Sequence, residues 1–372
     1  RTREGGRGQS MLPRPLRVSS SQVLLVVDGG VSTELERRGV SLHPLLWSAI
    51  VPVLGEAQDM DTLKQVHMDY LRAGSCIVST CSYQLSADLC ARAGFSEQTY
   101  HEAVQRSVQV AVQAREEFLH ERDVRAAAAQ EILVAGVIGC FGALLANGAE
   151  YTGSYPDTVT EEDLLQLHTT RAQELVEAGA DYLSVESIPN AMEARSLGRL
   201  LRENPSMFFT VSFTCQGPTR IADGTQLREA VKDLLFCDED GKWHCPDNLM
   251  AVGVNCTSPE HIASLLREFQ VLESEVGSNV LPPRMASPNS GEEWDSAQAQ
   301  WLRRPEQDIL PTTGGAPDEL VTVMKPLVEE WRRCGCRVFG GCCRTTPDHI
   351  AALRVLLEQK ALPSGEDSVT SD

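Results

Sequence analysis

Long apolar segments are absent from this sequence of 372 residues, and basic residues are few. No run approaches the roughly 18 consecutive apolar residues of a membrane-spanning helix, so we expect no membrane span. Lys and Arg number 33 against 52 Asp and Glu, which gives a formal net charge of −19 at pH 7. Because nucleic-acid binding depends on clustered Lys and Arg, this balance argues against a nucleic-acid partner. The expected class is an ordinary soluble globular protein.

Twelve cysteines are present, but the sequence lacks the features of a secreted disulfide scaffold. Such scaffolds are short, whereas this chain is long and has no apolar signal segment. We therefore predict reduced thiols in a reducing compartment, the cytoplasm. Cysteines in apolar surroundings, such as Cys76, Cys140 and Cys215, are predicted to be core residues.

The two ends of the chain differ in composition from the rest. Residues 1–22 contain five Arg and one acidic residue, and they include three consecutive Ser. Two interpretations are open: the remnant of an organelle transit peptide, or translated upstream sequence before a true start at Met11. Residues 361–372 contain Pro, Gly, Ser and acidic residues and are predicted to form a disordered acidic tail. One folded domain is then expected over residues 23–360.

Short β-rich runs alternate with helical patterns along this domain, which is typical of βα units around a parallel sheet. The predicted strands are 23–27, 76–80, 132–138, 182–185, 208–213, 250–254, 280–286 and 337–340. Eight runs indicate a single (β/α)8 barrel of the TIM type, with its active site at the carboxyl ends of the strands. The seventh run is the weakest, because Pro282 and Pro283 interrupt it.

A repeated joint between helix and strand supports the barrel. Gly74, Gly179 and Gly335 each follow a helical pattern and precede a predicted strand. A glycine in the left-handed conformation ends a helix and lets the chain turn directly into a strand. Two further helices are predicted to begin at Ser258-Pro259 and Thr346-Pro347, where a capping residue precedes proline.

Residues able to do chemistry follow several of the predicted strands. The strand ends carry Asp28, Tyr83, Glu186, Asn255, Cys256, Cys342 and Cys343. In a barrel these positions face one rim, so three thiols and two carboxylates are expected to meet there. A purely structural interpretation also exists for the two acids, as a turn-closing residue or a salt bridge at the rim.

Cys256 and the pair Cys342 and Cys343 lie in two copies of one plan. In each copy an apolar run is followed by cysteine, Ser or Thr, Pro, an acid, His and Ile. Three cysteine ligands with an open fourth position are typical of catalytic zinc, since structural zinc has four protein ligands. Two adjacent cysteines can both turn inward only if the backbone there is unusual. We expect Gly340 and Gly341 to supply this conformational freedom. Buried thiols without a metal are the alternative interpretation.

The two helices that start beyond these cysteines are expected to point their positive ends towards the sulfurs and help to keep them ionised. His261 and His349 fall inside the first turns of those helices, so we interpret them as helix-surface or packing residues. Zinc with three thiolates carries one net negative charge, and a substrate thiolate adds another. Such an electron-rich site suits a bound thiol, which has to lose its proton and stay nucleophilic. The residues indicate alkyl transfer to sulfur.

Eight motifs along the chain match one known family. They are DGGVSTELERRGV (28–40), HPLLWSA (43–49), VHMDYLRAG (66–74), GALLANGAEYTGSY (142–155), EAGADYLSVESIPNAMEA (177–194), VGVNCTSPEHI (252–262), PNSGEEWD (288–295) and FGGCCRTTPDHIAAL (339–353). On these motifs the chain resembles the homocysteine S-methyltransferase family, and most closely its S-methylmethionine-using branch. The resemblance covers nearly all of residues 23–358.

This resemblance implies a reaction and a metal. The family implies a zinc-bound homocysteine thiolate that attacks the methyl group of a sulfonium donor, with Cys256, Cys342 and Cys343 as the zinc ligands and catalytic residues. With S-methylmethionine as the donor both products are methionine, and S-adenosylmethionine is a poorer second donor. The expected protein is a zinc-dependent methyltransferase of methionine biosynthesis.

The resemblance also implies substrate contacts. Asp28 and Glu186 are expected to hold the amino group of homocysteine, and Tyr83 matches a family tyrosine near the metal. Asn255, which precedes a predicted ligand, is a further candidate for substrate binding.

Other functions on the same scaffold stay open. A betaine–homocysteine or a selenocysteine methyltransferase would share the zinc ligands, although an aromatic content of 5% is mild evidence against a cage for a quaternary ammonium group. A non-catalytic zinc- or thiol-binding barrel is the alternative from another class. Residues 139–141, 237–248 and 280–287 depart from the family pattern, and they leave the preferred donor open.

Overall fold

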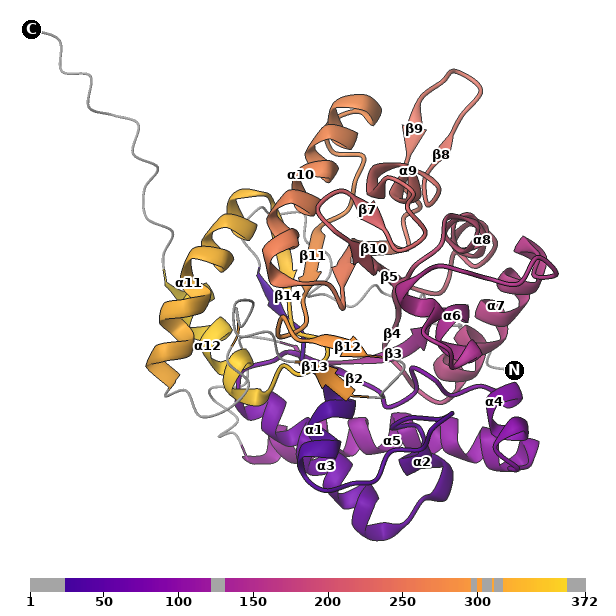
Figure 1. Ribbon diagram of the computed structural model, residues 1–372, viewed down its shortest axis with the longest axis vertical. Helices are drawn as coiled ribbons and strands as arrows, with labels where there is room; N and C mark the ends of the chain where they lie inside the picture. Colours follow the sequence, from indigo (N-terminus) through magenta and orange to yellow (C-terminus); the bar gives the residue numbers. More distant parts are fainter. Residues whose placement is uncertain (1–23, 122–130, 296–299, 303–309, 311–316, 360–372) are drawn as a thin grey trace, which may run out of the picture.

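The computed structural model describes residues 24–121, 131–295, 300–302, 310 and 317–359. Parallel strands form a central sheet with helices packed around it (Figure 1). The strands of this sheet are β1 (Leu25–Val26), β2 (Ile77–Ser79), β3 (Leu133–Gly139), β4 (Tyr182–Ile188), β5 (Phe209–Phe213), β10 (Leu249–Asn255), β11 (Arg284–Ser287) and β14 (Cys336–Phe339). The predicted terminal segments 1–22 and 361–372 lie outside the described residues.

The sheet closes on itself. Its order is β1-β14-β11-β10-β5-β4-β3-β2, and a parallel bridge between Val27 and Ile77 joins the first strand to the last. The amide of Asp28 continues this seam by donating to the carbonyl oxygen of Ile77 at 3.1 Å. The predicted (β/α)8 barrel and its eight strands are therefore confirmed.

The seventh strand, β11, is shorter than its sequence pattern suggested. Pro282 and Pro283 precede it rather than interrupt it, so the strand needs no ladder hydrogen bond from either proline. It opens with Arg284, which is only 6% exposed. This guanidinium forms an ion pair with Glu273 and donates to the carbonyl oxygen of Cys334. A buried but paired arginine explains why the strand does not look apolar.

Helices form the outer layer of the barrel. They are α1 (Val31–Arg37), α2 (Ile50–Leu54), α3 (Ala57–Arg72), α4 (Ala87–Arg92), α5 (Glu97–Glu121), α6 (Phe141–Leu145), the 3-10 helix η3 (Ala149–Tyr151), α7 (Glu161–Glu177), α8 (Ala191–Glu203), α9 (Leu227–Lys232), α10 (Pro259–Val276), α11 (Pro317–Arg333) and α12 (Pro347–Glu358). Gly74, Gly179 and Gly335 have φ values of 102°, 103° and 87°, so the predicted left-handed joints are present. None of the helices within the described ranges is long and apolar enough to cross a bilayer.

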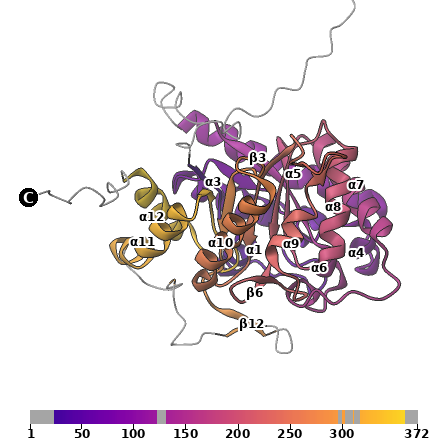
Figure 2. The same cartoon turned by 90° about the horizontal axis from the view of Figure 1, so that it is seen from above.

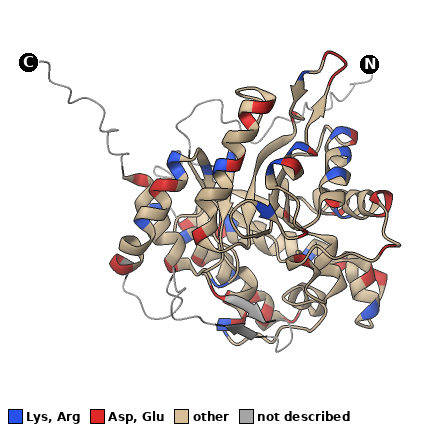
Figure 3. Cartoon of the chain, turned by 45° about the horizontal axis from the view of Figure 1, so that its top comes forward, with Lys and Arg blue, Asp and Glu red and all other residues tan. Residues whose placement is uncertain are grey.

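In the described part of the chain, three two-stranded sheets lie outside the barrel. They are β6 (Cys215–Gln216) with β7 (Arg220–Ile221), β8 (Phe236–Cys237) with β9 (Trp243–His244), and β12 (Glu293–Asp295) with β13 (Gln300–Leu302). β6 and β12 follow barrel strands and lie on the same side of the molecule (Figure 2). The β8–β9 hairpin lies at the surface, and its exposed tip is acidic (Figure 3). Cys215 lies in β6 and is only partly buried against the core, whereas Cys76 and Cys140 are buried as predicted.

The interior of the barrel changes from apolar to polar along its axis. Near the amino ends of the strands, buried side chains such as Leu133, Tyr182 and Met250 fill the interior. Alternate residues of a strand face the same side, so Ser184 and Glu186 follow Tyr182 on β4 towards the carboxyl end. The floor is thus a packed core, and the upper layer is a polar site.

Candidate active site

The cysteines converge from two strands that are not neighbours. Cys256 follows β10 and the pair Cys342 and Cys343 follows β14, while β11 lies between these strands. Strands two places apart are separated by about 10 Å, so the thiols can meet only if both loops bend over β11. Its carboxyl end provides the anchor: Ser287 and Pro288 accept hydrogen bonds from the amides of Cys256 and Cys342, at 3.1 and 2.8 Å.

Backbone conformation at this rim differs from the prediction. Neither Gly340 nor Gly341 adopts the left-handed region, whereas Cys256 and Arg344 do, with φ values of 48° and 65°. The two glycines are needed for space instead. A Cβ atom on Gly341 would lie 2.1 Å from Oγ1 of Thr345. The strained residues are thus a cysteine and the residue after the cysteine pair, which is common where a fold holds functional groups in place.

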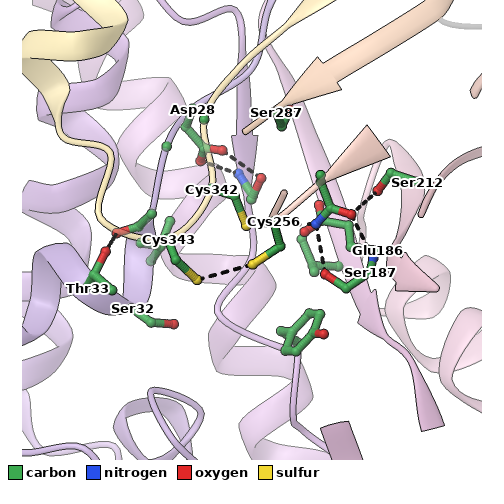
Figure 4. A pocket seen from close by; sticks show the side chains of 18 of the residues that line it. Asp28, Ser32, Thr33, Glu186, Ser187, Ser212, Cys256, Ser287, Cys342 and Cys343 are labelled. Carbon is green, nitrogen blue, oxygen red and sulfur yellow. Dashed lines mark hydrogen bonds between the residues drawn. The ribbon is translucent and has the colours of Figure 1, made fainter. Parts of the chain in front are cut away.

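The three sulfurs form a compact cluster. They lie within 4.8 Å of one another, and Sγ of Cys256 is 3.5 Å from Sγ of Cys343 (Figure 4). Sulfurs around one tetrahedral zinc ion are about 3.8 Å apart, given zinc–sulfur bonds of about 2.3 Å. Hydrogen bonds from Cys342 and Cys343 lower the pKa of Cys256 well below its ordinary value. The cluster can therefore hold one metal ion, and it favours a first thiolate even without one.

The helices beyond the cysteines begin where the sequence predicted. Ser258 precedes α10 and Thr346 precedes α12, and each helix has proline in its first turn. His349 lies in the first turn of α12, where its Nδ1 is 3.1 Å from the amide of Thr346 and completes a capping box. His261 is partly exposed beside Glu260. Neither histidine belongs to the sulfur cluster.

Asp28 lies at the seam of the barrel, beside Cys342 (Figure 4). It is 2% exposed, and Ser79 donates to it from its amide and from its hydroxyl, each at 2.7 Å. Burial raises the pKa of Asp28 to about 7, although the two Ser79 hydrogen bonds oppose the shift. A cation placed next to this carboxyl group would restore its ionised form.

Glu186 faces the cavity from within β4 rather than from beyond its end, because this strand continues to Ile188. Ser184, two residues earlier on the same side of the strand, donates to its carboxyl group at 2.9 Å. Burial and then the charge of Cys342 raise the pKa of Glu186 to about 8. The charge of Asp28 adds to this shift, so the two carboxyl groups act on one region near Cys342.

Asn255 connects the sulfur cluster to the fourth and fifth strands. Its Oδ1 accepts from the amide of Ser187 at 2.9 Å and from the hydroxyl of Ser212 at 2.8 Å. Its Nδ2 donates to Oγ of Ser187 at 2.8 Å and lies 3.8 Å from Sγ of Cys342. Ser187 has a φ of 61°, so the asparagine holds a strained residue at both its amide and its hydroxyl. Asn255 thus links the backbone next to Glu186 with the backbone next to Cys256.

Two tyrosines line the cavity, and sequence reasoning singled out only one. The hydroxyl of Tyr83 is 3.8 Å from Sγ of Cys140, whereas the hydroxyl of Tyr151 is 3.8 Å from Sγ of Cys256. Burial raises the pKa of Tyr151, so its hydroxyl stays protonated and can donate to the sulfur. Tyr151 belongs to η3 and not to a strand end, which is why a search of strand ends missed it.

The candidate residues share one cavity of about 160 Å³. It is lined by Asp28, Tyr83, Glu186, Asn255 and the three cysteines. The described residues that line the cavity include three carboxyl groups, those of Asp28, Glu186 and Glu150, and they include no Lys, Arg or His. The cavity is thus suited to cationic groups beside nucleophilic sulfur.

Fold and site together define the class: a (β/α)8-barrel enzyme whose strands gather three cysteine sulfurs at the carboxyl rim. The sequence model of homocysteine S-methyltransferases matches residues 25–357. The chain belongs to the homocysteine S-methyltransferase family and is a methyltransferase.

Individual relatives agree with this assignment. Homocysteine S-methyltransferase 3 of Zea mays is 36% identical over 337 residues, which cover 90% of each chain. The selenocysteine Se-methyltransferase of Brassica oleracea var. italica is 33% identical over 352 residues, or 92% of each chain. The crystal structure of the metallated form of the homocysteine methyltransferase MmuM from Escherichia coli has a TM-score of 0.70 and 34% identity, and the match covers 92% of this chain and 99% of that one.

Proposed function

We propose that this enzyme transfers a methyl group from S-methylmethionine to the sulfur of homocysteine at a zinc ion held by Cys256, Cys342 and Cys343. The observation that carries the proposal is the convergence of three sulfurs within 4.8 Å in a cavity lined by carboxyl groups. Both products are methionine when S-methylmethionine is the donor.

The donor set supports zinc. Three thiolates with room for a fourth ligand are typical of catalytic zinc, and a related barrel is known in a metallated form. Cys256, Cys342 and Cys343 would hold the zinc ion, which would lower the pKa of a substrate thiol and keep its sulfur nucleophilic. We include the cytoplasm in the proposal, because thiolate ligands bind metal only while they stay reduced.

Homocysteine is proposed to bind with its ammonium group between Asp28 and Glu186. Both carboxyl groups have raised pKa values, so each gains most from a cationic partner. Asn255 keeps the strained Ser187 in place next to Glu186, and Tyr151 donates towards the sulfur cluster. These contacts orient the nucleophile before the donor arrives.

The transfer itself needs no general acid. The sulfur of homocysteine, which has released its proton to solvent on binding, attacks the methyl carbon of the donor in line with the departing sulfur. A new carbon–sulfur bond forms as the old one breaks, and the electron pair stays on the leaving sulfur as a neutral thioether. The residues contribute alignment and a negatively charged surrounding that attracts the sulfonium ion.

Two alternatives on the same scaffold have specific support. Trp47, Tyr83 and Tyr151 line the cavity, so the low aromatic content of the whole chain does not exclude an aromatic surrounding for the quaternary ammonium of betaine. Similarity to a selenocysteine methyltransferase favours a selenol as an alternative acceptor.

Donor and acceptor profiling of the zinc-loaded enzyme tests these functions. Homocysteine is offered with S-methylmethionine, S-adenosylmethionine or betaine, and selenocysteine with S-methylmethionine, while product formation is measured by mass spectrometry. We expect one zinc per chain and the highest kcat/KM for homocysteine with S-methylmethionine. A zinc-loaded protein that makes no methionine from any donor would refute the enzymatic proposal in favour of a metal- or thiol-binding role.

A further inference from the structure

Glu150 is a partly buried acidic residue to which the proposed chemistry gives no role. It lies in η3, directly before Tyr151, and it lines the cavity. Its Oε2 is buried and has no hydrogen-bond partner among the described residues. An unpaired carboxyl oxygen is costly, and a cation that enters the cavity can offset this cost by pairing with the carboxyl group.

Glu150 acts on a different part of the cavity from the other two acids. Burial is the main cause of the raised pKa values of Tyr83 and Tyr151, and the charge of Glu150 adds to both shifts. The hydroxyl of Tyr151 lies 3.8 Å from Sγ of Cys256. Asp28 and Glu186 instead interact with Cys342 and with each other. The sulfur cluster therefore has one acidic region near Cys342 and a second near Tyr151.

The segment that carries Glu150 is held firmly. Glu193, which is fully buried, accepts the amide of Phe141 at 2.7 Å at the start of this segment. Asn190 donates to the carbonyl oxygen of Gly153 at 2.8 Å at its end. Within it, a Cβ atom on Gly142 would lie 2.7 Å from the amide nitrogen of Glu150. The backbone that carries Glu150 is thus fixed beside the cavity by packing and hydrogen bonds.

The proposed reaction supplies a cation for each acidic region. Homocysteine and S-methylmethionine each carry an α-ammonium group, and the donor also carries a sulfonium. The sulfonium has to lie next to the nucleophilic sulfur, where the anionic cluster balances its charge. Asp28 and Glu186 serve the ammonium of homocysteine, which leaves the ammonium of the donor without a partner on their side of the cavity.

We propose that Glu150 binds the α-ammonium group of the methyl donor and so selects amino-acid sulfonium compounds over sulfonium compounds that lack an amino group. This inference rests on the proposed function. Burial raises the pKa of Glu150, and an arriving ammonium group would restore the ionised carboxylate.

Donor comparison tests the inference without any mutation. The zinc-loaded enzyme is assayed with S-methylmethionine and with its analogue that lacks the amino group, 4-(dimethylsulfonio)butanoate. We expect kcat/KM to be at least about 10-fold lower for the analogue. Equal use of the two donors would overturn the inference. Failure of the enzyme to use S-methylmethionine at all would instead refute the proposed function.

Glu150→Gln locates the effect. We expect the KM for S-methylmethionine to rise about 30-fold, which corresponds to about 2 kcal/mol, with the KM for homocysteine and kcat/KM for the analogue unchanged. Asp157→Asn removes the same charge from an exposed position in the neighbouring loop and should change none of these three kinetic values. Equal losses with both donors would assign Glu150 to the sulfonium or to folding, and an unchanged KM for S-methylmethionine would also refute the proposal. If Glu150→Gln does not fold, equal use of the two donors by the unaltered enzyme still refutes the proposal.

Discussion

Replacing Asn255 by alanine should damage both the fold and the metal site, and the sizes of the two effects follow from its contacts. Three buried hydrogen bonds of 2.8–2.9 Å are lost, to the amide and hydroxyl of Ser187 and to the hydroxyl of Ser212. Each contributes about 1 kcal/mol net, and the Ser187 amide, left without an acceptor, adds about 1–2 kcal/mol. The free energy of unfolding should thus fall by about 4 kcal/mol.

A loss of this size is measurable by calorimetry. The entropy of unfolding is about 2.1 cal/mol/K per residue, so a chain of 372 residues loses about 1.3 °C of Tm per kcal/mol. We expect the Tm of metal-free Asn255→Ala to fall by about 5 °C. The strained φ of Ser187 should relax as well, since Asn255 holds that residue from both sides.

The same substitution should weaken zinc binding. Asn255 Nδ2 lies 3.8 Å from Sγ of Cys342, and its neighbour in sequence is Cys256. Groups that orient metal ligands typically contribute 10- to 100-fold to metal affinity. Competition with a chromophoric chelator should therefore show a zinc Kd raised about 10- to 100-fold.

Asn248 offers a matched control at the opposite end of the same strand. It precedes β10, it is 3% exposed, and its Nδ2 donates to three carbonyl oxygens at 2.9–3.0 Å. Asn248→Ala should lower Tm by about 4 °C, on the same scale of about 1 kcal/mol per bond, and leave zinc affinity unchanged. The reasoning fails if Asn255→Ala binds zinc as tightly as the unaltered enzyme, or if Asn248→Ala loses affinity to the same degree.

Further predictions concern the thiols and the homocysteine carboxyl groups. Cys342→Ser should lose zinc and activity, because a serine hydroxyl does not ionise near neutral pH, whereas Cys237→Ser, in the exposed β8–β9 hairpin, should keep both. Zinc analysis and methionine formation test this pair, and retained zinc in Cys342→Ser would contradict the assignment. Glu186→Gln should raise the KM for homocysteine about 10- to 100-fold at pH 8.5. Because the pKa of Glu186 is raised to about 8, the carboxyl is neutral below that pH, and the KM of the unaltered enzyme should fall as pH rises through about 8. Equal pH profiles for the enzyme and Glu186→Gln would show that this carboxyl does not bind the ammonium group.

Much of the barrel could be predicted because its signals are local. Apolar runs of strand length, the left-handed glycines at 74, 179 and 335, and the Ser-Pro and Thr-Pro helix starts each depend on a few neighbouring residues. The seventh strand was harder to recognise, because the burial of Arg284 depends on Glu273 of another element. An ion pair between two different elements produces no periodic pattern in the sequence of either element.

The candidate site, like the barrel, could be predicted only in part. Strand ends identified Asp28 and the cysteines, since a barrel brings all strand ends to one rim. Tyr151 and Glu150 escaped that search, because they lie in a short helix between α6 and α7 that reaches the cavity only in the folded chain. Loops of this kind carry function without a regular pattern.

The sequence by itself determined that this chain forms a (β/α)8 barrel with thiols and carboxylates at its rim, because periodicity and strand-end chemistry are written locally. Only the tertiary structure decided how the sulfurs meet. They come from strands separated by β11, and they approach because the carbonyl groups of Ser287 and Pro288 hold both loops and Cys256 adopts a left-handed backbone. The tertiary structure also decided the charges of the site. Burial depends on the whole fold, and it raises the pKa values of Asp28 and Glu186. The same fold places Glu150 in the lining of the cavity.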